Sequence, residues 1–206
     1  MIFNDEARCS KDAACSNCVT SHKSFCVMTM LYISEKLLLR QVELTDAEVI
    51  FETINNQRQY LRKWLPFVNL TKQVDDTRNF IRGIYKNQEL VFVMQFEGEF
   101  AGLIGYSGTD RANRKTEIGY WLSEPFQHKG IVTESVKQLV KFAFEKLQFN
   151  RVEINCAVGN ISSKKIPQKL GFQFEGIERD GELLSDAIFA DIERYSLCKR
   201  KDKIQF

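Results

Sequence analysis

Apolar residues recur along this chain with two different spacings, which predict alternating strands and helices. Short apolar runs bounded by polar residues predict strands over residues 37–42, 90–96, 100–108, 116–122, 151–158, 172–179 and 187–197. Apolar residues three or four positions apart predict helices over residues 45–54, 75–85, 130–147 and 160–170, with a shorter helical piece over 58–64. The order β-α-α-β-β-β-α-β-α-β-β predicts an α/β fold, with a mixed sheet in one domain and helices on both faces.

Local signals set the expected ends of several elements. Thr45 and Glu48 have the spacing of a capping box, so we expect the first long helix to begin with the Thr45 hydroxyl accepting the Glu48 N–H. Pro66 ends the short helical piece that precedes it. Asp180 and Gly181 are residues that favour turns, and they predict a turn between the last two strands.

Residues 1–31 differ from the rest of the chain. They lack apolar periodicity, and we expect a disordered N-terminal extension to a folded domain of residues 32–206. Four soft metal ligands in this segment could instead close a tetrahedral zinc site: Cys15, Cys18, His22 and Cys26. Both later spacers are one residue shorter than in the usual zinc knuckle, so we expect no metal.

Composition and charge narrow the class of protein. The net charge of +2 gives no basic field for nucleic acid, and no apolar run approaches the roughly 20 residues that a membrane-spanning helix needs. Charged residues interrupt any candidate signal sequence in the first 30 positions. We therefore expect a cytoplasmic protein that binds neither nucleic acid nor membrane. The sequence does not decide between a monomer and a homodimer.

The segment between the predicted strand 116–122 and the predicted helix 130–147 carries the clearest chemical signal. A glycine-containing loop at the start of a helix leaves several backbone N–H groups without partners. Those groups and the helix dipole favour a phosphate-bearing ligand. The loop consists of Gln127, His128, Lys129, Gly130, Ile131 and Val132.

This loop resembles the acetyl-CoA loop of the GNAT acetyltransferase family, Gln/Arg-x-x-Gly-x-Gly/Ala. Gln127 and Gly130 match the pattern, and Val132 stands where the family has a small residue. That position acts mainly through its backbone, so valine is compatible with the pattern. The resemblance implies a GNAT-like fold with acetyl-CoA as co-substrate.

Three further segments resemble the Rim-type branch of the family, which acetylates the N-termini of ribosomal proteins. They are residues 113–122 (NRKTEIGYWL), 158–163 (VGNISS) and 170–172 (LGF). The resemblance covers about residues 36–200. No cysteine falls in a motif that would support a covalent intermediate, so we expect direct attack of an amine on acetyl-CoA in a ternary complex.

The resemblance also implies how the donor is held. The strands 117–122 and 151–158 are expected to splay apart, so that their unpaired backbone groups bind the pantetheine arm. A backbone N–H near Trp121 or Leu122 would serve the developing oxyanion. Asn160 reads as a helix N-cap from its position, and the family implies that it also contacts the pantetheine.

Ser163 matches a serine implied as the general acid toward the CoA thiolate in the Rim-type branch, and it would also lie along the pantetheine. Its alternative interpretation is a serine in the first helical turn that is satisfied locally. Many other GNAT proteins have a tyrosine at the position of Pro167, which cannot donate a proton. This departure favours Ser163, or water, as the acid.

Glu117 is the candidate general base, because it lies on the strand that is expected to line the cleft. The alternative is a structural carboxylate paired with Lys115 or Arg151. Glu153, on the neighbouring strand, is the second candidate for the base.

Together these residues predict an acetyl-CoA-dependent N-acetyltransferase that acts on a primary amine. The resemblance points to a protein N-terminal α-amine of the ribosomal-protein-serine type. Two alternatives stay open at this point: a small-molecule amine such as a polyamine or an aminoglycoside, and a non-catalytic acyl-CoA-binding module.

Overall fold

The computed structural model describes residues 29–184 and 188–199; the cysteine-rich segment with Cys15, Cys18, His22 and Cys26 lies outside them. The strands are β1 (Met30–Tyr32), β2 (Leu37–Gln41), β3 (Val91–Phe96), β4 (Glu99–Asp110), β5 (Lys115–Leu122), β6 (Arg151–Ala157), β7 (Gln173–Leu183) and β8 (Phe189–Cys198). The α-helices are α1 (Ala47–Asn56), α2 (Arg58–Leu61), α3 (Val74–Asn87), α4 (Ile131–Glu145) and α5 (Ile161–Lys169). Short 3-10 helices are η1 (Leu44–Asp46), η2 (Pro66–Asn69) and η3 (Glu124–Phe126).

The eight strands of the described residues form one sheet in the order β1-β2-β3-β4-β5-β6-β8-β7. Neighbouring strands are antiparallel, except that β5 and β6 are parallel. Parallel neighbours need a crossover connection, and α4 provides it because it lies between β5 and β6 in the chain. The predicted mixed α/β sheet is confirmed. β1 is an additional edge strand, too short to show an apolar pattern.

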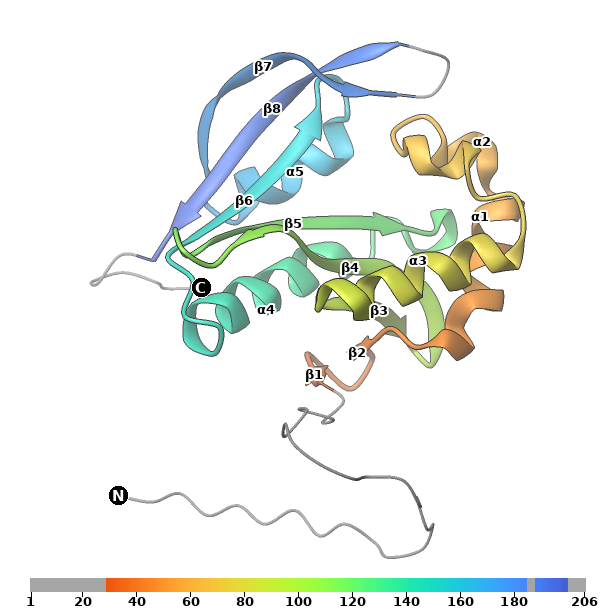
Figure 1. Cartoon of the computed structure of the whole chain (residues 1–206). Helices are drawn as coiled ribbons and strands as arrows, with labels where there is room; N and C mark the ends of the chain where they lie inside the picture. The colour runs from red at the N-terminus through yellow and green to blue at the C-terminus, as the bar shows by residue number, and fades with distance from the viewer. Residues whose placement is uncertain (1–28, 185–187, 200–206) are drawn as a thin grey trace, which may run out of the picture.

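The sheet forks between its two parallel strands. The ladder between β5 and β6 contains three registered pairs, Lys115 with Arg151, Thr116 with Val152 and Glu117 with Glu153. Beyond these pairs the two strands diverge toward the side of the molecule where α2 lies (Figure 1). The splayed strands implied by the family resemblance are therefore present. We call the gap beyond Glu117 and Glu153 the fork.

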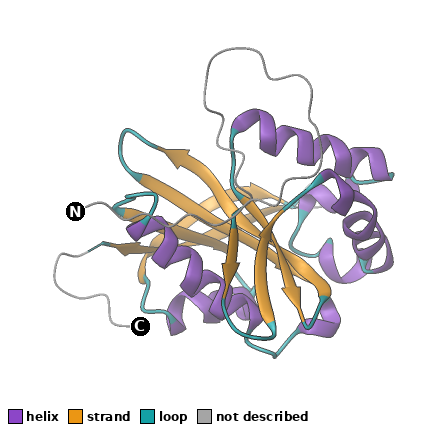
Figure 2. Ribbon diagram, turned by 90° about the horizontal axis from the view of Figure 1, so that it is seen from below, coloured by secondary structure: helices purple, strands orange, loops and turns teal. Residues whose placement is uncertain are grey.

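Helices cover both faces of the sheet (Figure 2). On one face, α4 buries Phe144 in a core cluster that includes Ile118 of β5. On the other face, α1 and α3 form a second cluster, in which Ile81 packs with Trp121 of β5. Each large apolar side chain buried in this way contributes about 1.5–3 kcal/mol. No helix in the described part of the chain has the length and apolar character to span a membrane.

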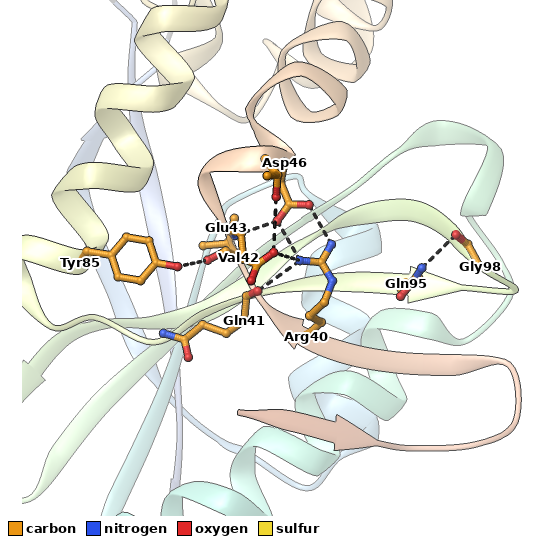
Figure 3. Close-up of polar contacts among 9 residues, drawn as sticks. Arg40, Gln41, Val42, Glu43, Asp46, Tyr85, Gln95 and Gly98 are labelled. Carbon is orange, nitrogen blue, oxygen red and sulfur yellow. Dashed lines mark hydrogen bonds and ion pairs between the residues drawn. The ribbon is translucent and has the colours of Figure 1, made fainter. Parts of the chain in front are cut away.

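The start of α1 differs from the predicted capping box. The carboxylate of Asp46 accepts the Glu43 N–H at 2.7 Å and two hydrogen bonds from Arg40, at 2.9 and 2.7 Å (Figure 3). These charge-assisted bonds stabilise the 3-10 turn η1, which directly precedes the first residue of α1. The Thr45 hydroxyl donates to the side chain of Glu43 instead of accepting from Glu48. The prediction of a Thr45–Glu48 box is therefore wrong.

Polar contacts tie α3 to its surroundings. Arg78 of α3 forms an ion pair with Glu48 of α1 at 2.7 Å. The Tyr85 hydroxyl of α3 donates to the carbonyl oxygen of Val42 at 2.8 Å (Figure 3). Because these contacts reinforce the apolar cluster, the helical segment α1–α3 is held in a fixed place beside the fork.

The predicted turn at Asp180 and Gly181 is wrong. β7 continues through both residues to Leu183, and its pairing with β8 shifts register between Glu178 and Glu182. The Asp180 N–H donates to the Asp191 side chain at 2.9 Å, which stabilises the irregularity. A local turn signal has therefore produced a bulge inside a longer strand, because pairing with β8 continues on both sides of it.

Candidate active site

A cavity of about 880 Å³ lies at the fork. β5 contributes Glu117 and Tyr120 to its lining, β6 contributes Asn155, and α5 contributes Ser163. Residues of the helical segment α1–α3 and of the β7–β8 hairpin complete the wall. The structure thus brings the two predicted catalytic residues, Glu117 and Ser163, to one cavity.

β5 directs its side chains to opposite sides of the sheet. Trp121 belongs to the cluster with α1 and α3, whereas Tyr120 packs on the cluster that contains α4. Side chains alternate along a strand, so Glu117 lies on the face of Trp121. The Tyr120 hydroxyl reaches Ser163 of α5. Glu117 and Ser163 therefore approach the fork from opposite faces.

The predicted phosphate loop has the backbone of an anion site. His128 and Gly130 are exposed and have left-handed φ values of 62° and 74°. α4 begins directly afterwards at Ile131, and within the described residues no side chain caps its first turn. The first N–H groups of a helix lack intrahelical partners, so this end of α4 favours a negatively charged group.

Two residues of the loop can reach a ligand only through their backbone. The side chains of Ile131 and Val132 are 2% and 8% exposed and belong to the core cluster of α4. This explains why a valine is compatible with a position that the family fills with a small residue. Its side chain faces away from any ligand at the helix end.

The side chains of Gln127 and Lys129 are engaged within the protein. Gln127 Nε2 donates to the Tyr60 hydroxyl, which connects the loop to the α2 segment. The Lys129 ammonium lies 5.5 and 5.0 Å from the ring centres of Phe96 and Phe126. Cation–π contacts of this kind contribute about 0.5–1 kcal/mol at exposed sites. These contacts hold the loop beside the start of α4.

Asn160 is the N-cap of α5, as predicted. Its Oδ1 accepts the Ser163 N–H at 3.2 Å, and the helix begins at the next residue. The Ser163 hydroxyl lies 2.9 Å from the Tyr120 hydroxyl, which also lies 3.2 Å from the Ser163 carbonyl oxygen. Burial raises the pKa of Tyr120 above its ordinary value, so this phenol stays protonated. No sequence pattern indicated this contact of Tyr120, because Tyr120 is distant in the chain from Ser163 of α5.

Glu117 has a partner that the sequence did not suggest. Asn155 Nδ2 donates to Glu117 Oε2 at 2.9 Å, so the partner is an amide rather than Lys115 or Arg151. Burial raises the pKa of Glu117 above its ordinary value, and the bond from Asn155 opposes this effect. Glu153 accepts a bond from Arg151 at 2.6 Å. A carboxylate in an ion pair is a weaker candidate for a base than one bonded to a neutral amide, which favours Glu117.

Glu182 is a second cavity carboxylate with a raised pKa, and no sequence pattern indicated it. Glu182 lies at the bulge of β7 and lines the cavity. Burial raises its pKa even though part of the side chain is exposed, and its charge in turn raises the pKa of Glu117. Its position depends on the bulge, which the sequence suggested to be a turn.

The cavity has an apolar wall and an excess of negative charge. The helical segment contributes Trp64, Phe67, Leu70 and Phe80, of which Leu70 and Phe80 are 75% and 50% exposed. Exposed apolar side chains that gather around a cavity indicate a binding surface. The charged residues of the lining are five carboxylates and one guanidinium: Asp76, Glu89, Glu117, Glu178, Glu182 and Arg194.

Comparison with known proteins places the chain among acetyltransferases. Residues 36–173 match the acetyltransferase (GNAT) domain family. YdaF of Bacillus subtilis (strain 168), provisionally named a ribosomal N-acetyltransferase, is 37% identical over 174 residues, which cover 82% of this chain and 94% of YdaF. The ribosomal-protein-serine acetyltransferase of Escherichia coli (strain K12) is 27% identical over 168 residues, which cover 80% of this chain and 93% of that enzyme.

A solved structure shares the fold. The ribosomal alpha-N-protein acetyltransferase RimL, in complex with coenzyme A, matches with a TM-score of 0.78 and 22% identity, over 82% of this chain and 98% of RimL. This likeness concerns the fold, while the family match and the 37% identity to YdaF concern the sequence. On these grounds the chain belongs to the GNAT family of N-acetyltransferases.

Proposed function

We propose that this enzyme transfers an acetyl group from acetyl-CoA to the α-amine at a protein N-terminus, in a ternary complex. The observation that carries the proposal is the fork cavity, where Glu117 and Ser163 approach from opposite faces of the sheet. An amine that attacks from one side and a thiol that leaves on the other need groups in this arrangement.

The donor would be held mostly by backbone groups. The N–H groups of residues 127–132 would bind the pyrophosphate at the start of α4. The splayed edges of β5 and β6 would bind the pantetheine arm, with a contact from the Asn160 side chain. A backbone N–H near Trp121 or Leu122 would stabilise the oxyanion. The coenzyme A complex of RimL, which shares the fold, supports this donor.

The reaction forms a carbon–nitrogen bond and breaks the thioester carbon–sulfur bond. Glu117 accepts the proton that the amine loses, and its raised pKa suits it to this role. Ser163 donates its hydroxyl proton toward the departing thiolate and regains one from solvent. An α-amine, with a pKa of about 8, needs less help from a base than a lysine. Burial raises the pKa of Cys156 to about 11, which disfavours a covalent cysteine intermediate.

Glu182 is the second candidate for the base. It lines the same cavity, and its pKa is also raised by burial. Glu117 is preferred because its carboxylate is held by Asn155 at the mouth of the fork. A carboxylate on an exposed bulge is less fixed in position. The comparison of Glu117→Gln with Glu182→Gln distinguishes them, and the larger loss of turnover identifies the base.

The walls of the cavity support a peptide as the acceptor. A net negative cavity attracts an ammonium group. The apolar wall of Trp64, Phe67, Leu70 and Phe80 fits the side chains that follow the first residue of a peptide. A polyamine has only a hydrocarbon chain and further charges, and an aminoglycoside is mostly hydroxylated. Neither would use this wall fully.

A panel of acceptors tests the proposal. Peptides that copy ribosomal-protein N-termini, a polyamine and an aminoglycoside are each incubated with acetyl-CoA while thiol release is followed. Mass spectrometry locates the acetyl group, and a peptide with a formylated N-terminus and a free lysine is the control. We expect acetylation at the α-nitrogen. Acetylation of the small amines alone would overturn the acceptor, and binding of acetyl-CoA without thiol release would favour the non-catalytic module.

A further inference from the structure

The side chain of Asn155 has one satisfied end and one open end. Its Nδ2 donates to Glu117, but its Oδ1 is buried and has no hydrogen-bond partner within the described residues. Buried polar atoms are nearly always paired, so an orphaned acceptor needs an explanation. Because Asn155 lines the fork cavity, the missing donor can come from a bound molecule.

Asn155 lies where the reacting groups must meet. Glu117 and Glu153 are the last registered pair of the β5–β6 ladder, and Asn155 is two residues further along β6. Its side chain therefore lies on the same face as Glu153, and its bond to Glu117 spans the mouth of the fork. A ligand that contacts Glu117 in the cavity therefore lies beside Asn155, which lines the same cavity.

We propose that Asn155 and Glu117 form a two-point seat for the acceptor amine, in which Asn155 Oδ1 accepts one N–H and Glu117 accepts another. The proposal rests on the proposed acetylation of an amine. It gives the selectivity for a primary amine a basis in two named residues. It also makes Asn155 a residue that touches the substrate, in addition to its bond with Glu117.

The number of hydrogens on the nitrogen explains the selectivity. A neutral primary amine has two N–H groups and one lone pair. When the two N–H groups point to Asn155 and Glu117, the lone pair of the tetrahedral nitrogen points away from both residues. In this arrangement the lone pair is free to attack the thioester bound in the fork. A neutral secondary amine has one N–H and a hydroxyl has one O–H. Either would leave one acceptor of the seat unpaired, which weakens binding substantially.

Paired peptides test the seat. A peptide that begins with serine is compared with the same peptide beginning with N-methylserine, and kcat/KM is measured for the wild type, Asn155→Ala and Asn155→Leu. The wild type should prefer the primary amine by at least about tenfold. Both variants should lose most of this preference. Asn113→Ala, which removes an amide bonded to Asp110 outside the cavity lining, should retain it.

The outcomes separate the seat from the proposed function. If no peptide is acetylated by the wild type, the acceptor assignment fails before the seat is tested, and the same ratio is then measured with a primary small amine and its N-methyl derivative. If peptides are acetylated but the variants slow both peptides equally, Asn155 only positions Glu117 and the seat is overturned. Circular dichroism and thermal unfolding confirm that the variants are folded, and two different replacements guard against a single misfolded one.

Discussion

The two faces of the sheet at the fork differ in the groups that they present to a ligand. On the α4 face, the part of the proposed donor site that binds the pyrophosphate consists of backbone groups in one short segment, residues 127–132, with buried side chains at Ile131 and Val132. On the α1–α3 face, the proposed acceptor site consists of side chains from separate elements, such as Glu117 of β5 and Asn155 of β6. The proposed pyrophosphate site is therefore local in sequence, whereas the proposed acceptor site is assembled only by folding.

The substitution Gly130→Glu should have the largest effect, and it should affect only the binding of acetyl-CoA on the donor face. The left-handed φ of 74° at Gly130 disfavours any side chain, and a carboxylate there would repel the pyrophosphate. We expect acetyl-CoA affinity to fall at least about 100-fold. Calorimetry measures it, with Gly98→Glu as the matched control, since Gly98 also has a left-handed φ (88°) and open space around it. Unchanged affinity in Gly130→Glu would remove the loop from the donor site.

Removal of the proposed base should reduce turnover through the acceptor face alone. Glu117→Gln keeps the size of the side chain but cannot accept a proton, so kcat should fall about 100-fold or more. Steady-state kinetics measures this loss with a peptide acceptor. Glu153→Gln is the control, because Glu153 is already paired with Arg151. Equal losses in the two variants would mean that neither carboxylate has the assigned role.

Tyr120 and Ser163 should behave as one unit on the donor face. Tyr120→Phe and Ser163→Ala are each expected to lower kcat about tenfold with little change in acetyl-CoA affinity, and the double variant should lose little more. Tyr106→Phe is the control, since it also removes a tyrosine hydroxyl bonded to a backbone carbonyl, that of Leu139 in α4. Additive losses would show that the 2.9 Å contact of the two hydroxyls has no role in turnover.

Two carboxylates should show opposite effects of pH on stability. Burial raises the pKa of Glu117, so its ionised form destabilises the fold as pH rises, and Glu117→Gln should raise the melting temperature at pH 7.

The surface carboxylate of Glu175 should show the opposite effect. Hydrogen bonds from Arg151 and Ser196 lower the pKa of Glu175 to about 2, so its stabilisation is present above about pH 4.5 and is lost as pH falls toward 2. Glu175 is on the surface, so Glu175→Gln should cost less than about 1 kcal/mol. Melting curves between pH 2 and 8 measure both, and a lower melting temperature for Glu117→Gln at pH 7 would contradict the assignment.

The contrast between local patterns and contacts across the fold also explains what the sequence could predict. The order of strands and helices and the loop around Gly130 depend on local patterns, and the structure has them where expected. Asn155, Tyr120 and Glu182 depend on contacts between elements that are far apart in the chain, so no spacing could indicate them.

The two errors in the prediction of secondary structure have different origins. Thr45 has the pattern of a helix cap, but the ion pair of Arg40 with Asp46 and the bond from Glu43 set the start of the helix instead. Asp180 has the pattern of a turn residue, but pairing of β7 with β8 on both sides of it keeps the strand continuous. At Thr45 other side chains of the same segment replace the predicted cap, and at Asp180 pairing with a neighbouring strand outweighs the local turn preference.

One measurement tests most directly whether donor and acceptor functions lie on opposite faces. Acetyl-CoA is titrated into the wild type and into the double variant Glu117→Gln/Asn155→Ala by calorimetry, and peptide acetylation is assayed on the same samples. We predict that the Kd for acetyl-CoA changes by less than about threefold while turnover is lost. A parallel loss of acetyl-CoA binding, in a double variant that melts like the wild type, would contradict the division of the site into two faces.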